Sequence, residues 1–378
     1  MKVLHVATVA ATINAFLLPF AREFRDLGWQ VDAAAEGVKQ FPDVQNAHDK
    51  CYEIGFCRNP LKIRALIQSM IEIRNLLKRE RYDIVHVHTP IASFLTRIAS
   101  IGLGSSKLFY TAHGFHYVKS NPFWKNAVYY LAEKCAGQLT DHLFVINQDD
   151  YSFAVKRRIL SKDKITFLPG IGVDPNEYYC SNSRRKLVRE QIGVSDKVFL
   201  ILQVAELNEN KNHHIVIRAL ELFKESHPTS DFIYLVVGAG EKRLELENLA
   251  KAVGLSHQIM FLGQRDDVPD LLSACDVVTL SSLREGLPRC LLEAMSVGRP
   301  IIASNIRGCK DLLSSGAGVL VDPKNSQQWA KAIQNVYLSP NQAKAMADKG
   351  RELIINRYQE KKVVPLVVDV YLKEITND

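Results

Sequence analysis

Short apolar runs alternate with amphipathic stretches along the whole chain of 378 residues. Runs such as KVLHVATV at 2–9 and VFLILQV at 198–204 are almost entirely apolar, as expected for parallel strands buried on both faces. The stretches between such runs, for example 14–27 and 60–80, carry apolar residues at helical spacing. The pattern therefore predicts successive β–α units.

We expect these β–α units to form two domains, because a chain of 378 residues exceeds the roughly 250–300 residues beyond which apolar cores tend to split. The expected strands of both halves are KVLHVATV, QVDAAAE, DIVHVHT, KLFYTAHG, HLFVINQ, KITFLPG, VFLILQVAEL, FIYLVVGAG, IMFLGQ, DVVTLSS, RPIIASN and GVLVDP. A segment rich in turn formers at 169–185 marks the junction. The prediction is an α/β fold with two doubly wound, Rossmann-like domains, 1–175 and 176–356, and a terminal helix at 357–378. Functional residues are expected directly after strands.

The formal charge of +7 suits an anionic partner, such as a phosphorylated small molecule or an anionic membrane surface. Nucleic acid is not expected, because the basic residues are spread through the α/β elements without a recognisable binding module. Seven scattered cysteines without a CxxC pair indicate reduced thiols in the cytoplasm. The N-terminus is interpreted as a strand rather than a secretory signal, and no apolar stretch approaches the ~18 residues of a membrane span.

The segment 281–305, SSLREGLPRCLLEAMSVGRPIIASN, follows an expected strand and carries two carboxylates eight positions apart. Glu285 lies in the loop, Gly286 lets the main chain approach a ligand, and Pro288 suits the first turn of a helix. Glu293 then lies about 7.5 Å further along that helix. Such carboxylates can hold the hydroxyls of two sugars, with a diphosphate at the helix N-terminus between them. Solvated glutamates are the alternative, and the spacing alone does not exclude them.

The arrangement E-G-x-P-x-x-x-x-E-A-M-x-x-G-x-P-I-I-A resembles the signature of retaining, GT-B-fold glycosyltransferases of family 4. Similarity is greatest to enzymes of bacterial capsule, exopolysaccharide and lipid-linked oligosaccharide assembly. YDIVHVHTP, TAHGF, FLPGIGVD, AELNENKNH and FLGQRDDVPDLLSACDVV follow the family's order, so the resemblance covers nearly the whole chain. It implies a first domain on the acceptor side, a second that binds the nucleotide-sugar donor across a central cleft, and a terminal helix that packs back on the first.

The resemblance also implies roles for individual residues of that segment. Glu293 binds the ribose hydroxyls of the nucleotide, and Glu285 holds the donor sugar. The main chain near Leu287, Pro288 and Arg289 meets the phosphates.

A lysine in the loop VAELNENKNH can neutralise a diphosphate leaving group as a point charge. By resemblance, this loop usually carries an arginine and a lysine that both contact the diphosphate. Lys211 stands at the lysine position, but Glu206 occupies the arginine position. Either another cation completes the phosphate site or the activity is weak. The candidate cations are Arg265, Arg289 and Arg307.

Two glycine-containing turns are further candidates for the nucleotide site. VVGAGEKR has a G-x-G without a third glycine, because Arg243 stands there, and this argues against a dehydrogenase. The resemblance implies instead that Gly240 lines the nucleotide cleft. It also implies that the turn near Gly263–Arg265 contacts the base, although an ordinary β–α connection remains the alternative.

His113, in TAHGF, is expected directly after a strand, where an imidazole could hydrogen-bond the donor sugar or stabilise the transition state. A structural histidine is the alternative. His86 and His88 share one strand face but lack a nearby third ligand, so strand-end packing is favoured over a metal site.

The segment 115–134 mixes aromatic and cationic side chains, including Phe123, Trp124, Lys119 and Lys125, as at a bilayer interface. A lipid-diphosphate-linked saccharide acceptor would bring the enzyme to a membrane. An ordinary amphipathic helix is the alternative.

The predicted function is retaining transfer of a sugar from a nucleotide diphosphate sugar to a hydroxyl of a lipid-linked or polysaccharide glycan. The resemblance alone suggests a UDP-sugar donor, of N-acetylhexosamine type, and a reaction that needs neither a metal nor another cofactor. Asp149–Asp150 and Asp266–Asp267 are interpreted as helix-start or turn residues rather than metal ligands. The expected location is the cytoplasm or the inner face of the cell membrane. A GT-B-fold UDP-sugar 2-epimerase and, because of Glu206, a weakly active sugar-nucleotide-binding partner subunit remain alternatives.

Overall fold

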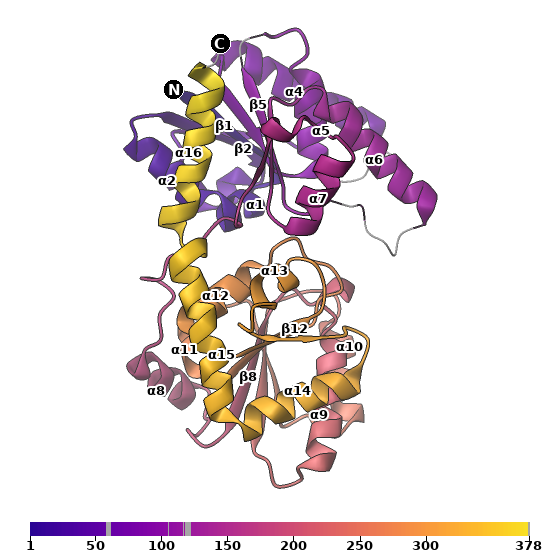
Figure 1. Ribbon diagram of the computed structural model, residues 1–378, viewed down its shortest axis with the longest axis vertical. Coiled ribbons are helices and arrows are strands. Elements are labelled where there is room, and N and C mark those ends of the chain that lie inside the picture. Colours follow the sequence, from indigo (N-terminus) through magenta and orange to yellow (C-terminus); the bar gives the residue numbers. More distant parts are fainter. Residues whose placement is uncertain (58–61, 105, 116, 118–121, 377–378) are drawn as a thin grey trace. The chain divides into compact units, whose positions relative to one another are not determined.

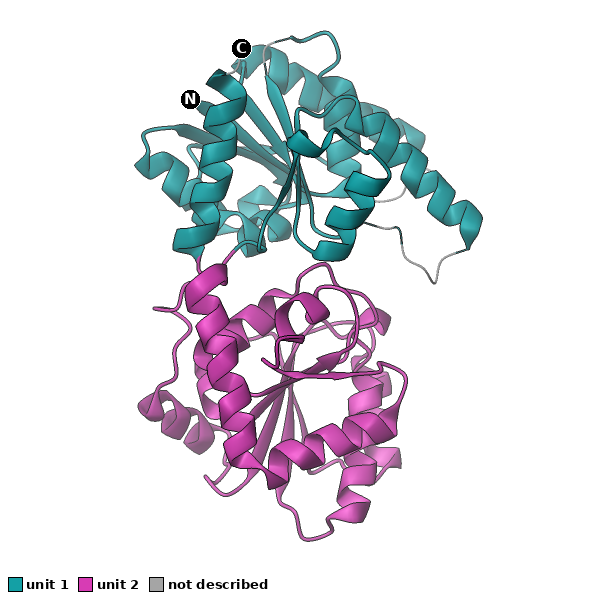
Figure 2. Cartoon of the chain, in the orientation of Figure 1, with its two compact units in different colours: residues 1–171, 360–378 teal, residues 172–359 magenta. Residues whose placement is uncertain are grey.

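The computed structural model describes all residues except 58–61, 105, 116, 118–121 and 377–378. It divides into two compact units, residues 1–171 with 360–378 and residues 172–359 (Figure 2). These boundaries lie a few residues from the predicted ones, and the last helix belongs to the first unit. Lys119 and residues 60 and 61 of the expected helix 60–80 lie outside the described residues.

A seven-stranded parallel sheet forms the centre of unit 1, in the order β3-β2-β1-β4-β5-β6-β7. Its strands are β1 Lys2–Val9, β2 Gln30–Glu36, β3 Lys50–Glu53, β4 Ile84–Val87, β5 Lys107–Ala112, β6 His142–Val145 and β7 Ile165–Phe167. The sequence did not predict β3, because this edge strand has exposed charged ends and no apolar run. The strand order reverses between β1 and β4, which is where doubly wound sheets place a ligand crevice.

The helices of unit 1 connect these strands. They are α1 Ala10–Phe16, α2 Leu18–Asp26, α3 Pro42–Ala47, α4 Ile63–Glu80, α5 Pro90–Ala99, α6 Phe123–Gly137, α7 Gln148–Lys156 and α16 Glu360–Thr376. The helix predicted at 14–27 is divided at Leu17, because Pro19 in the first turn of α2 has no N–H to continue the hydrogen bonds of α1. The predicted terminal helix, 357–378, begins at Glu360, because Ile354–Tyr358 form a π-turn and Gln359 is extended.

Alternate residues of the unit 1 strands point to opposite faces of the sheet. Leu4 and Val6 of β1 lie in an apolar cluster with Ile73 of α4. On the opposite face, α16 lies beside α2 (Figure 1), and the ring of Tyr371 is centred 5.4 Å from that of Phe24. Both faces are therefore covered, as the apolar strand pattern predicted.

Unit 2 contains a six-stranded parallel sheet in the order β10-β9-β8-β11-β12-β13. Its strands are β8 Phe199–Val204, β9 Phe232–Val237, β10 Ile259–Gly263, β11 Val277–Leu280, β12 Ile301–Ser304 and β13 Val319–Val321, all of which the sequence predicted. β8 lies at the reversal of strand order, next to β11, so the ligand crevice of this unit is expected after β8 and β11.

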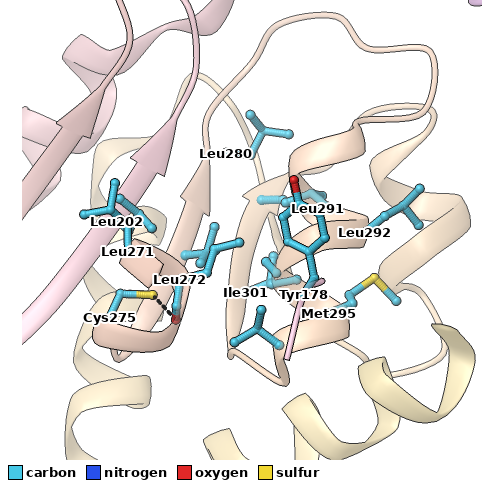
Figure 3. Close-up of a cluster of buried hydrophobic side chains, with 14 of the residues drawn as sticks. Tyr178, Leu202, Leu271, Leu272, Cys275, Leu280, Leu291, Leu292, Met295 and Ile301 are labelled. Carbon is cyan, nitrogen blue, oxygen red and sulfur yellow. Dashed lines mark hydrogen bonds between the residues drawn. The ribbon is translucent and has the colours of Figure 1, made fainter. Parts of the chain in front are cut away.

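The helices of unit 2 cover both faces of its sheet. They are α8 Asn182–Gln191, α9 His213–Ser226, α10 Arg243–Ala252, α11 Val268–Ala274, α12 Arg289–Val297, α13 Cys309–Leu313, α14 Ser326–Leu338 and α15 Pro340–Leu353. Leu291 and Met295 of α12 pack in one cluster with Leu280 of β11 (Figure 3). Tyr234 of β9 and Trp329 of α14 belong to the cluster on the other face. Two doubly wound α/β units confirm the predicted fold class.

Within the described part of the chain, none of the helices has both the length and the apolar character that crossing a bilayer requires.

Candidate active site

Three loops of unit 2 meet at the carboxyl ends of β8, β11 and β12, which are neighbouring strands. The Leu283 amide donates to the Asn210 carbonyl at 2.7 Å, and the Asn210 side-chain amide donates to the Arg284 carbonyl at 3.0 Å. In the third loop, Arg307 Nε donates to the Glu285 carbonyl at 3.4 Å. The site is therefore built by hydrogen bonds between loops that are far apart in the sequence.

Lys211 and Glu285 form an ion pair in this site. The Lys211 Nζ to Glu285 Oε1 distance is 2.6 Å, and the side chains are 23% and 14% exposed. Burial by itself lowers the pKa of the Lys211 ammonium, but the Glu285 carboxylate raises it, and the net pKa lies above its ordinary value. The ammonium is therefore charged at neutral pH. The lysine carbonyl accepts hydrogen bonds from Ser281 Oγ at 2.8 Å and Gln203 Nε2 at 3.3 Å, which orient the loop.

Arg289 and Glu293 form a second ion pair, with 2.8 Å between Nε and Oε1. Burial raises the pKa of the Glu293 carboxyl, and Arg289 opposes that rise. The Tyr178 hydroxyl also interacts with this carboxylate and lowers the pKa of Glu293. Pro288 lies near the first turn of a helix, as expected: α12 begins at Arg289, and extended Pro288 is its N-cap residue. The two carboxylates of the predicted pair thus each contact a cation.

Glu206 lies in the same β8 loop as Lys211 but makes a different contact. Its carboxylate accepts a hydrogen bond from Asn208 Nδ2 at 2.9 Å, and it is exposed. A Cβ at Gly238 would lie 2.0 Å from the Ala205 carbonyl oxygen, so only glycine permits this approach of the β9 loop to the β8 loop. Gly240 approaches the Leu207 carbonyl in the same way, at 2.3 Å. Gly240 thus supports the loop that carries Lys211.

Arg265 is held by a neighbouring carboxylate. Its Nε and Nη2 donate to the two carboxylate oxygens of Asp267 at 2.7 and 2.5 Å. Asp267 lies directly before α11, which is the helix-start position that the sequence predicted for it.

His113 lies in unit 1, directly after β5, where the sequence predicted it. Its Nε2 lies 3.3 Å from His88 Nδ1, and its ring is centred 5.2 Å from that of Phe16. Burial lowers the pKa of His113 to about 4, so the imidazole is neutral at pH 7. A small cavity adjoins this ring, and its lining includes Tyr371 of α16.

Hydrogen bonds indicate the tautomers of His48 and His88, two buried histidines of unit 1. His48 Nδ1 lies 2.8 Å from the Val44 carbonyl, which can only accept, so His48 Nε2 is free to accept from His5 Nδ1 at 3.2 Å. His88 Nε2 is buried without a hydrogen-bond partner, so the less costly arrangement protonates His88 Nδ1, which then donates to His113.

Strand packing was the favoured interpretation of His86 and His88. His86 hydrogen-bonds Thr111 Oγ1 at 2.7 Å through Nε2 and the Tyr371 hydroxyl through Nδ1. In the residues that the structure describes, no group of three or more His, Cys, Asp or Glu side chains is placed to hold a metal ion.

Acid is expected to destabilise unit 1 more than unit 2. In unit 1 burial lowers the pKa of several histidines: His5, His48, His86, His88, His113 and His142. Each is neutral when folded and binds a proton on unfolding below its ordinary value of 6.5, so each removes about 1.4 kcal/mol of unfolding free energy per pH unit between pH 6.5 and its lowered pKa. In unit 2 the pKa of His213 is lowered in the same way.

Denaturant titrations at pH 7.5, 6 and 5 would measure this difference. Trp29 reports on unit 1 and buried Trp329 on unit 2, in variants that keep one of the three tryptophans. Equal acid sensitivity of the two signals would contradict the prediction.

Several residues of the site were not predicted from sequence. Tyr178 lies in the junction segment 169–185, and Ser281 directly follows a strand, so both positions carried a signal. The contact of Tyr178 with Glu293, and that of Ser281 with Lys211, depend on the folded arrangement of separate loops.

Comparison with known proteins identifies the class of enzyme. Residues 184–353 match the family of glycosyl transferases group 1, and residues 2–147 match the glycosyl transferase 4-like family. The Bacillus subtilis protein named glycosyltransferase EpsD is 32% identical over 376 residues, covering 98% of this chain and 96% of its own. An Escherichia coli UDP-Gal:α-D-GlcNAc-diphosphoundecaprenol α-1,3-galactosyltransferase is 30% identical over 323 residues, 85% of this chain and 83% of its own.

Solved structures show the same fold. Anabaena HepE in complex with UDP-glucose has a TM-score of 0.83 at 22% identity, covering 99% of this chain and all of its own. The lipopolysaccharide glycosyltransferase WaaG has a TM-score of 0.78 at 18% identity, over 98% of this chain and 99% of its own. The chain therefore belongs to the GT-B-fold glycosyltransferases of family 4. Its activity is glycosyl transfer.

Proposed function

We propose that this glycosyltransferase moves a sugar from a UDP-sugar, of N-acetylhexosamine type, to a hydroxyl of a lipid-diphosphate-linked glycan, with retention of anomeric configuration. The observation that carries the proposal is the meeting of the β8, β11 and β12 loops around the Lys211–Glu285 pair. The names of the Escherichia coli relative and of the HepE complex support a UDP-linked donor, and the name of the first also supports a lipid-diphosphate acceptor. The N-acetylhexosamine type of the sugar follows from the sequence resemblance alone.

In the proposed donor complex, Glu293 accepts hydrogen bonds from the ribose hydroxyls and Glu285 from the donor-sugar hydroxyls. The diphosphate lies at the N-terminus of α12, where the helix dipole favours an anion. The main chain of Gly286, Leu287 and Arg289 lies against the phosphates, and the two separate turns that contain Gly240 and Arg265 adjoin the nucleoside.

During transfer, the bond between the anomeric carbon and the outer phosphate oxygen breaks, and its electrons remain on the diphosphate. Lys211 stabilises this charge, without a bound metal. The acceptor oxygen attacks from the face that the diphosphate leaves, and its proton passes to the departing phosphate oxygen. Neutral His113 is proposed to donate a hydrogen bond to the sugar through the nitrogen that faces away from His88.

A donor screen that follows release of nucleoside diphosphate tests the function. Release that depends on a lipid-diphosphate saccharide supports transfer, and an NMR coupling constant of the product gives its anomeric configuration. Formation of an epimer without release would show a 2-epimerase instead. Nucleotide-sugar binding without either reaction would show a partner subunit, the possibility that Glu206 raises.

Replacing Glu293 with glutamine is expected to abolish discrimination against a 2′-deoxyribose donor. A buried carboxylate that accepts from a ribose hydroxyl contributes about 1.5–3 kcal/mol, or roughly 10–100-fold in KM. KM for the UDP-sugar and its 2′-deoxy analogue should therefore become similar in the variant. A variant that still discriminates as the wild type does would show that Glu293 does not bind the ribose.

Helix α6 is proposed to contact the anionic cytoplasmic face of the membrane. Phe123 and Trp124 at its start are 89% and 68% exposed, and Val128 and Leu131 continue the exposed apolar surface. Lys125 follows Trp124 directly, and apolar and aromatic side chains beside cations suit a bilayer interface.

A Phe123→Ser/Trp124→Ser variant is expected to bind phosphatidylglycerol vesicles at least ~10-fold more weakly, because each aromatic ring contributes about 1.5–3 kcal/mol on burial. Vesicle sedimentation measures this, and Leu244→Ser, which removes an exposed leucine of unit 2, is the matched control. Unchanged binding of the double variant would contradict a role of α6.

A further inference from the structure

The charges around the Lys211–Glu285 pair do not by themselves favour a diphosphate. Lys211 carries one positive charge, whereas Glu285, which pairs with it, and Glu206 in the same loop carry two negative charges. A diphosphate would meet a net negative set of side chains there. Binding of such an anion requires another cation at the same place.

Two arginines near the site are already engaged with carboxylates. Arg265 forms the paired hydrogen bonds with Asp267, and Arg289 pairs with Glu293. Each of these two arginines is thus held by a carboxylate other than Glu285, the residue that Lys211 contacts.

Arg307 is placed directly beside Glu285. Its Nε donates to the Glu285 carbonyl at 3.4 Å, while the Glu285 carboxylate binds Lys211 at 2.6 Å. Lys211 and Arg307 therefore contact the same residue, at the loop that leads into α12. Since the two cations come from the β8 and β12 loops, they approach this loop from separate strands.

The main chain next to Arg307 packs closely against the loop that carries Glu285. Gly308 has φ +78°, and a Cβ there would lie 2.1 Å from the Gly286 carbonyl oxygen. The β12 loop thus rests on the main chain of Glu285–Gly286. This contact holds Arg307 at the point where the sugar-side phosphate is proposed to lie.

We propose that Arg307 is the second cation of the diphosphate site and that it contacts the outer phosphate, the one that bears the sugar. The inference rests on the proposed donor site, because Glu285 is assigned to the sugar attached to that phosphate. The planar guanidinium donates paired hydrogen bonds to phosphate oxygens. It stabilises the charge that collects there when the glycosidic bond breaks.

Calorimetric titration of UDP and UMP into Arg307→Gln tests this assignment. The variant is expected to lose about 10–100-fold in UDP affinity and less than about threefold in UMP affinity, because only UDP has the outer phosphate. Lys310→Gln, which removes an exposed positive charge of α13, is the matched control and should bind both nucleotides as the wild type does.

A second cation placed on the β8 loop should restore the lost affinity. Glu206→Arg in the Arg307→Gln background is expected to recover at least ~10-fold of UDP affinity, since it supplies a guanidinium and removes a carboxylate. If Arg307→Gln does not fold, Arg307→Lys replaces it, with UDP affinity expected to fall and UMP affinity to stay the same.

These titrations distinguish a failure of the proposed donor site from a failure of the Arg307 assignment. Wild-type protein that binds no nucleoside diphosphate overturns the proposed donor site and the inference with it. Equal UDP affinity of the wild type and Arg307→Gln overturns the inference alone. Equal losses of UDP and UMP affinity also overturn it, because they would show that Arg307 supports the loop and does not contact the phosphate.

Discussion

Replacing Lys211 with alanine is expected to lower kcat by about 10²–10³-fold while leaving the protein folded. Lys211 is the cation held 2.6 Å from the proposed sugar-binding carboxylate, and the leaving diphosphate gains charge in the transition state. Removing one such preorganised group typically costs about that factor. The change should appear mainly in kcat, because the interaction strengthens as the bond breaks.

Two control variants distinguish loss of the Lys211 charge from a structural effect of the substitution. Lys211→Arg keeps the charge and should retain more activity than alanine. Lys242→Ala removes another partly exposed lysine, whose partners Glu209 and Glu245 lie outside the proposed contacts, and should leave kcat unchanged. Wild-type kcat in Lys211→Ala would contradict its role at the leaving group.

Much of the fold could be predicted because parallel strands buried on both faces leave a strong apolar signal. The same reasoning fails where that signal is absent. β3, KCYE, is half-exposed and was missed, and the break between α1 and α2 depends on the position of Pro19 within a continuous apolar pattern.

The sequence predicted individual residues of the site but not the contacts between them. Lys211 and Glu285 were each placed after the correct strand by their motifs. Their pairing was not predicted, since they are 74 positions apart and meet only because β8 and β11 are neighbours in the sheet. The contact of Arg307 with the Glu285 carbonyl depends in the same way on the adjacent β12.

The tautomer of His113 could not be predicted from the sequence. The sequence places it after a strand, but its tautomer depends on His88, whose other nitrogen is buried without a partner. No sequence pattern contains that information. Which nitrogen of His113 can donate therefore follows from packing alone.

Replacing Glu285 with glutamine is expected to lower kcat/KM by about 10²-fold or more. The amide keeps the shape of the side chain but loses charge-assisted hydrogen bonds to the sugar, and it leaves the Lys211 ammonium, which is 23% exposed, without its carboxylate. Steady-state kinetics with the donor varied would measure this loss. Wild-type kcat/KM in the variant would contradict the proposed sugar contact.

A double-mutant cycle then decides whether Lys211 and Glu285 act together. Groups that form one unit lose activity non-additively, so the Lys211→Ala/Glu285→Gln variant should lose less than the product of the two single losses. The physical reason is that Glu285 orients the ammonium through the 2.6 Å contact, and an orienting group has nothing to orient once the lysine is gone. Strictly multiplicative losses would show that the sugar contact and the leaving-group contact are independent, and that the ion pair is only the resting arrangement of two charges that separate when the donor binds.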